Sequence, residues 1–143
     1  MTKTRLKIEF DFDFTLIGIV TPLQDYRMAW FLNNIMHKAL KKTEDHLLKD
    51  EKNRRVMSFS KYYFEEAITK SFFYLLENKH EIDCLLPEMK ELDYLLMING
   101  DYYKSRKTEI LKKIRSLDDV QTAVILKPSE IKSKNNLIME DDQ

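Results

Sequence analysis

The amino-acid sequence predicts a single α+β domain, a mostly antiparallel sheet of about five strands with two helices on one face. Three observations lead to this prediction. Short apolar or alternating runs, typical of strands, are interspersed with two longer segments whose apolar residues recur at helical spacing. Only two glycines and three prolines occur in 143 residues, which favours long regular elements. The order β-α-β-β-β-α-β places a strand–helix–strand unit at each end, a plan related to the ferredoxin-like split β-α-β fold.

The first predicted strand begins in a cleanly alternating stretch. In Lys7–Phe14 every second residue is apolar and the residues between them are charged, which indicates a strand with one buried and one wet face. Leu16–Val20 continues the strand and is apolar on both faces. Gly18 within it indicates a bulge or a close packing contact.

The first helix is predicted from Pro22 to Leu40. Thr21 is a suitable N-cap, Pro22 suits the first helical position, and Gln24 completes a capping box. An apolar stripe follows at helical spacing, formed by Met28, Leu32, Ile35, Met36 and Ala39.

The middle of the chain carries the aromatic strands. We expect Thr43–Arg55 to be a loop with a short strand at His46–Lys49. Val56–Glu66 and Ile68–Asn78 are rich in aromatic residues and predict a pair of strands joined as a hairpin. A helix over Tyr63–Leu76 is the alternative, because glutamates, an alanine and a lysine at its centre are good helix formers.

The last third of the domain repeats the strand–helix–strand pattern. Tyr94–Ile98 is short, apolar without alternation and closed by Asn99-Gly100, so it predicts a strand buried on both faces. A second helix follows over Asp101–Leu117, and a final strand over Val120–Lys127. The domain is expected to occupy residues 1–130. Residues 131–143 form a polar tail whose apolar triplet, Leu137–Met139, docks on the sheet.

Composition and charge narrow the classes of function. Lysine plus arginine and aspartate plus glutamate both total 24, so the chain lacks the basic excess of a dedicated nucleic-acid binder. The lone Cys84 cannot form an intramolecular disulfide, which favours a reducing compartment. No signal peptide or membrane-length apolar run is present, so we expect a cytoplasmic protein without membrane contact. The spacing of histidines and the single cysteine matches no zinc signature, and the carboxylates of Glu9, Asp11 and Asp13 are expected to be a solvated strand face, so no metal or cofactor is predicted.

The face of the sheet opposite the helices is expected to be wet or covered by a partner. The aromatic strands Phe59–Phe64 and Phe72–Leu76 suggest such a partner, including a second copy of the chain. The alternative is that these aromatic side chains fill the domain's own core.

The stretch Leu86-Pro87-Glu88-Met89-Lys90-Glu91-Leu92-Asp93-Tyr94 carries a family resemblance. It is similar to the motif Ile-Pro-Glu-x-x-x-Val-Asp-Tyr that names a bacterial family, with Leu86 in place of isoleucine and Leu92 in place of valine. The resemblance extends to Phe14–Ile19, to Asp25-Tyr26-Arg27 and to the Ser-Lys-x-Asn-Leu run that begins at Ser133. It implies an identity and no activity.

These stretches supply the candidate functional surface, Glu88, Asp93, Tyr94, Asp25 and Arg27. Glu88 and Asp93 in one site would bind a cation or a basic group of a partner. In the alternative interpretation Glu88 lies at the start of a short helix, Asp93 accepts backbone N–H groups, and Tyr94 enters the core. No catalytic residue is predicted.

The second helix is basic on its outer face. Its candidate basic patch comprises Lys104, Arg106, Lys107, Lys112, Lys113 and Arg115. We expect a non-catalytic accessory protein that binds a protein partner or itself. RNA or ribosome binding through the basic patch is the alternative, and a small ligand-binding enzyme using Glu88 and Asp93 is a third possibility.

Overall fold

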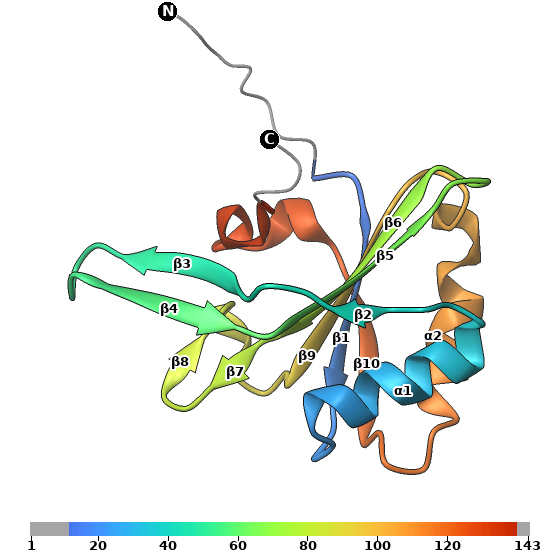
Figure 1. Cartoon of the computed structure of the whole chain (residues 1–143), viewed down its shortest axis with the longest axis horizontal. Coiled ribbons are helices and arrows are strands. Elements are labelled where there is room, and N and C mark those ends of the chain that lie inside the picture. The colour runs from blue at the N-terminus through green and yellow to red at the C-terminus, as the bar shows by residue number, and fades with distance from the viewer. Residues whose placement is uncertain (1–11, 140–143) are drawn as a thin grey trace, which may run out of the picture.

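A computed structural model describes residues 12–139, which fold into an α+β structure with a six-stranded sheet, two α-helices and two small two-stranded sheets (Figure 1). The predicted α+β class, with a mostly antiparallel sheet and two helices, is therefore confirmed. The α-helices are α1 (Asp25–Met36) and α2 (Lys107–Arg115). The strands are β1 (Thr15–Val20), β2 (Lys41–Lys42), β3 (His46–Asp50), β4 (Arg55–Phe59), β5 (Lys61–Glu66), β6 (Ser71–Glu77), β7 (Lys79–His80), β8 (Asp83–Cys84), β9 (Tyr94–Asn99) and β10 (Thr122–Leu126).

The main sheet has the order β10-β1-β9-β6-β5-β2, and every neighbouring pair is antiparallel. β1, the first strand in the described part of the chain, lies between β9 and β10, because its Gly18 is opposite Leu95 of β9 on one side and Val124 of β10 on the other. β9 is buried from Tyr94 to Ile98, as its unbroken apolar run predicts. The predicted alternating strand covers Lys7–Phe14, but β1 begins only at Thr15, so residues 12–14 are not strand. Residues 7–11 lie outside the described part of the chain.

Both helices pack on one face of this sheet. Met28 and Leu32 of α1 and Ile114 of α2 are fully buried in a core with alternate side chains of β1 and β9, such as Ile17 and Leu96. Successive strand residues point to opposite faces, so the residues between them belong to a second core on the other side.

The opposite face is covered by the chain itself, so the expectation of a wet or partner-covered face is wrong. Leu85, Leu86 and Leu92 lie in the connection between β8 and β9 and are buried there. Ile131, Leu137 and Met139 come from the C-terminal segment, and Phe59 comes from the end of β4. Tyr74 of β6 is buried in the same core, so the aromatic strands fill this chain's own interior.

The described part of the C-terminal segment is therefore not a polar tail. Two short 3-10 turns, Pro128–Glu130 and Lys134–Leu137, lie just before it and within it. Leu137 and Met139 of its apolar triplet are buried against the sheet, as predicted. Residues 140–143 lie outside the described part.

The helix boundaries differ from those predicted, because nonlocal contacts compete for the capping groups. The Thr21 hydroxyl donates to the Asp119 carbonyl oxygen (2.6 Å) and accepts from Leu23 N–H, so it caps no helix. α1 begins at Asp25, three residues late, and ends at Met36 because His37 adopts a left-handed φ of 56°. α2 begins only at Lys107, after a 3-10 turn over Lys104–Arg106, and ends at Arg115.

The predicted strand Val56–Glu66 is broken at Ser60. Its first half, β4, pairs with β3 in a separate hairpin that extends from the body as an arm (Figure 1). Its second half, β5, pairs with β6 in the main sheet, so the predicted β5–β6 hairpin is confirmed and the alternative helix over Tyr63–Leu76 is wrong. A sixth strand, the two-residue β2, was not predicted.

Candidate functional site

The five residues of the candidate functional surface lie in different surroundings. Asp25, Asp93 and Tyr94 come together where the chain enters α1. Glu88 contacts the C-terminal segment, and Arg27 lies on the exposed face of α1. Glu88 and Asp93 hydrogen-bond to different segments, so no contact joins them in one site among the described residues.

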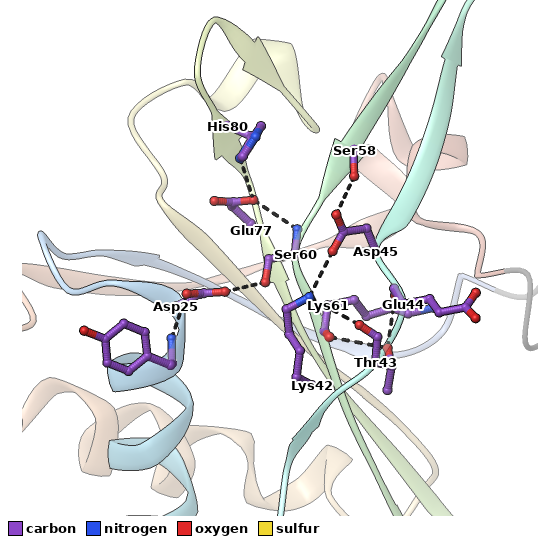
Figure 2. A network of polar contacts seen from close by, with 11 residues as sticks. Asp25, Lys42, Thr43, Glu44, Asp45, Ser58, Ser60, Lys61, Glu77 and His80 are labelled. Carbon is purple, nitrogen blue, oxygen red and sulfur yellow. Dashed lines mark hydrogen bonds and ion pairs between the residues drawn. The ribbon is translucent and has the colours of Figure 1, made fainter.

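At the start of α1, the carboxylates of Asp25 and Glu77 contact Ser60 in the bend between β4 and β5. Ser60, at that bend, donates its hydroxyl hydrogen bond to Asp25 Oδ2 (2.5 Å). Its backbone N–H donates to Glu77 Oε1 (3.0 Å), and His80 Nδ1 lies 3.2 Å from the same oxygen. Figure 2 shows Asp25, Ser60, Glu77 and His80 as one connected chain of polar contacts. These contacts fix the N-terminal turn of α1 to the sheet.

Asp93 and Tyr94 reinforce the same junction from β9. Asp93 Oδ2 accepts from the backbone N–H of Thr21 (2.9 Å), and its other oxygen lies 3.4 Å from Lys79 Nζ. The Tyr94 hydroxyl donates to the carbonyl oxygen of Leu23 (2.7 Å). Each of these side chains holds the segment that leads into α1.

Burial and the nearby carboxylates act on two tyrosines here. Burial, together with the charges of Asp25 and Glu77, raises the pKa of Tyr62 to about 12. Burial and the same two charges also raise the pKa of Tyr94 well above its ordinary value. Both phenols stay neutral at physiological pH, so Tyr94 remains a hydrogen-bond donor.

The polar contacts at this junction join α1 to the sheet. A serine nucleophile needs a base that accepts its proton, usually a histidine. Ser60 instead donates to a carboxylate, and His80 contacts Glu77. No group of three or more histidine, cysteine, aspartate or glutamate side chains suited to a metal ion occurs among residues 12–139.

Glu88 binds the C-terminal segment to the connection between β8 and β9. Its carboxylate accepts from the backbone N–H (2.8 Å) and the hydroxyl (2.6 Å) of Ser133. Although partial burial raises the pKa of Glu88, these hydrogen bonds outweigh it and hold the pKa below its usual range. Leu86 and Leu92, on either side in the motif, are buried in the second core.

Arg27 belongs to a set of side chains that we name the α1 aromatic face: the exposed Tyr26, Arg27 and Trp30 and the half-buried Phe31. Tyr26 and Trp30 lie one turn apart, and each is 61% exposed. The Arg27 guanidinium lies 5.6 Å from the centre of the Phe31 ring, and the Trp30 and Phe31 rings meet edge to face at 5.1 Å. The sequence analysis missed the two exposed aromatic residues, although their spacing of four, off the apolar stripe, is a signal for them.

The basic patch is partly engaged in contacts within the chain. Lys104 Nζ lies 2.5 Å from Asp13 and 2.9 Å from Asp101, and the hydrogen bonds to these two carboxylates raise its pKa. Arg106 stacks on the ring of Tyr102 at 3.7 Å, and Arg115 Nε donates to the Ala123 carbonyl oxygen (2.9 Å). Lys107, Lys112 and Lys113 are exposed.

Comparison of the chain with protein-family models, with curated proteins and with solved structures found no match. Within the described residues, no helix has the length and apolar character needed to cross a membrane.

Proposed function

We propose that this protein is a non-catalytic binding module that engages a protein partner through the α1 aromatic face. The observation that supports the proposal is the exposure of Tyr26 and Trp30, each 61%, one helical turn apart with Arg27 between them. Tryptophan, tyrosine and arginine are the residue types that most often dominate protein–protein binding energy.

The rigidity of α1 supports the same proposal. The helix is fixed at its start by Asp25 on Ser60 and by Tyr94 on Leu23. After its end, the Asn33 side chain accepts from Leu40 N–H (2.8 Å) and donates to Leu40 O (3.2 Å). A surface that is already ordered loses less conformational entropy on binding, so exposed aromatic side chains on it contribute more affinity.

The experiment compares four forms of the tagged full chain, purified gently from its native host at low salt: the wild type, Trp30→Ala, Tyr26→Ala/Trp30→Ala and Ile68→Ala. Ile68 is the matched control, because it is 95% exposed in the turn between β5 and β6. We expect a stoichiometric protein with the wild type and with Ile68→Ala. Loss of a central aromatic anchor is expected to weaken binding by roughly 30-fold.

Two controls accompany this comparison. Equal thermal unfolding temperatures show that the variants keep the fold. A photo-reactive residue at position 30 is expected to cross-link the partner, and the same residue at position 68 is not. Retention of the partner by Tyr26→Ala/Trp30→Ala would refute the proposed surface, and a nuclease-sensitive, salt-dependent companion would replace it with RNA binding by the basic patch.

A ferredoxin-like relation and a cytoplasmic location are parts of this proposal. The relation is supported by β9 and β10, which are joined through α2 and lie parallel on either side of β1. In that relation the segment from β2 to β5 is an insertion between α1 and β6. The single cysteine supports a reducing compartment.

A further inference from the structure

A groove of about 490 Å3 lies at the β10 end of the main sheet. Its lining comes from β10 and the residue after it, from the first turn of α2, and from segments that cover the opposite face of the sheet. The lining residues are Met89, Lys107, Ile125, Leu126, Lys127, Glu130 and Ile131. The groove thus lies along the C-terminal half of the edge strand. No residue of the α1 aromatic face lines it.

The edge of β10 offers backbone hydrogen-bonding groups to an incoming strand. β10 is the last strand of the sheet, and its strand partner within residues 12–139 is β1 alone. The Arg115 side chain contacts the strand backbone at Ala123, near its start. The residues that line the groove, Ile125 to Lys127, follow that contact. Such an edge is a template for an added strand.

The side chains of the groove indicate what such a strand would carry. Ile125 on the helix side of the sheet, and Leu126 and Met89 on the side of the second core, are partly exposed in the lining, so the groove accepts apolar side chains. Two exposed lysines, Lys107 and Lys127, stand in the lining against one carboxylate, Glu130, whose Oε2 lies 3.5 Å from Lys127 Nζ. The excess of positive charge complements acidic side chains.

We propose that this groove binds an extended segment of a partner protein, in which acidic and apolar residues alternate, as an added strand on β10. Alternation matches the pleat, because one set of side chains enters the groove and the backbone pairs with the edge. A second β10 is a poor occupant, because Thr122–Leu126 contains no acidic residue to meet Lys107 and Lys127. This inference goes beyond the proposed function, because it assigns a second surface with its own ligand chemistry.

The test uses the purified full chain and three synthetic probe peptides. The first is acetyl-Glu-Val-Glu-Ile-Glu-Val-amide with a fluorescent label, the second replaces each glutamate by lysine, and the third is the first peptide with alternate backbone nitrogens methylated. We expect the first peptide to bind. The second and third are expected to bind at least tenfold more weakly, because one lacks the charge and the other lacks the edge hydrogen bonds.

Exposed charge-reversal variants locate the site. Lys107→Glu and Lys127→Glu are each expected to weaken the first peptide by roughly three- to tenfold. Lys112→Glu is the matched control, because Lys112 is exposed on α2 and does not line the groove. Trp30→Ala is expected to bind the peptide as the wild type does, so failure of the proposed function and failure of this inference are distinguishable. Hydrogen exchange is expected to slow at residues 122–127 when the peptide binds.

Several outcomes would overturn the inference. These are equal binding of the acidic and basic peptides, undiminished binding of the methylated peptide, and no binding of the acidic peptide at millimolar concentration. Protection from exchange confined to another part of the chain would also do so. Self-association of the chain in the ultracentrifuge that the acidic peptide reverses would show that a second copy occupies the groove instead.

Discussion

Placing a methyl group at Gly18 tests the packing of the second core most directly. Gly18 is buried in β1, an interior strand of the sheet, and a Cβ atom there would lie 2.5 Å from Leu92 Cδ1, 3.0 Å from its Cδ2 and 3.3 Å from its Cγ. Leu92 is only 3% exposed and is packed in the second core, so its side chain has little room to move. Gly18→Ala is therefore expected to overpack this core and to lower the free energy of unfolding by about 1–3 kcal/mol.

The partner substitution makes the reasoning quantitative. Leu92→Ala removes the clashing atoms but leaves a cavity, at a cost of about 2–5 kcal/mol. In Gly18→Ala/Leu92→Ala the new methyl group occupies part of the vacated space. The double variant is expected to be more stable than the sum of the two single effects predicts, by about 1 kcal/mol or more.

Urea unfolding followed by far-ultraviolet circular dichroism measures these differences. Tryptophan fluorescence is a weak probe, because the single tryptophan, Trp30, is largely exposed before unfolding. Ile68→Ala is the control and is expected to unfold like the wild type. A stability of Gly18→Ala equal to that of the wild type would refute the packing argument, and so would strict additivity in the double variant.

Three further predictions concern titratable groups. Burial raises the pKa of Glu66, but hydrogen bonds from Lys38, Thr69 and Tyr103 outweigh this effect and hold the pKa at about 2. The stability that the ionised Glu66 contributes is therefore present above about pH 4.5 and is lost as the pH falls toward 2. Glu66→Gln is expected to lower the unfolding free energy by about 1–3 kcal/mol at pH 7, and a deficit that stays constant down to pH 2 in calorimetry would contradict this. Burial and the charges of Asp25 and Glu77 raise the pKa of Tyr62 to about 12, so the stability that the neutral phenol contributes is lost as the pH rises from 10 to 12. Absorbance at 295 nm is expected to show a tyrosine that ionises late, and Tyr62→Phe is expected to reduce this signal. An unchanged titration curve in Tyr62→Phe would exclude the raised pKa. Burial also raises the pKa of the Cys84 thiol, so its reaction with a disulfide reagent at pH 8 is expected to be slower in the folded protein than in urea, and equal rates would show that the thiol is open.

Local patterns were sufficient to predict the sheet strands that lie deepest. β9 follows from an unbroken apolar run that ends at Asn99-Gly100, and the fold buries it on both faces. Gly18 indicated a bulge or close packing, and the close contact with Leu92 is what the structure has. The apolar run of β9 depends on residues next to one another in sequence, so the sequence reveals it, whereas the contact partner of Gly18, Leu92, comes from a distant segment.

Features that depend on distant partners could not be predicted in this way. The sequence predicts a capping box of Thr21 and Gln24, but the Thr21 hydroxyl donates its hydrogen bond to the carbonyl oxygen of Asp119, 98 residues away. The break at Ser60 has no glycine or proline to indicate it, because the bend is held by Asp25 and Glu77. The C-terminal segment appeared to be a tail, because the apolar surface that buries Ile131 and Leu137 belongs to other elements.

The candidate site shows the same division. The charges of Asp25, Asp93 and Arg27 were visible in the sequence, and three of the five candidates do share one junction. The sequence does not show that the junction holds α1 in place, or that α1 exposes Tyr26 and Trp30 to solvent. Both features follow from the arrangement of the strands. Helical spacing shows which residues share a face, but the tertiary fold decides which face is outward.

The position of β1 between β9 and β10 has a consequence for biosynthesis. The first described strand has no neighbour in the sheet from the first half of the chain, because Ile19 is opposite Tyr94 and Ala123. During synthesis β1 can pair on both sides only after the last part of the chain has left the ribosome. The β3–β4 and β5–β6 hairpins join residues close in sequence and can form early. A nascent chain that stalls before residue 122 would therefore keep an apolar strand unpaired on one side. Chaperones and proteases would recognise this exposed apolar edge.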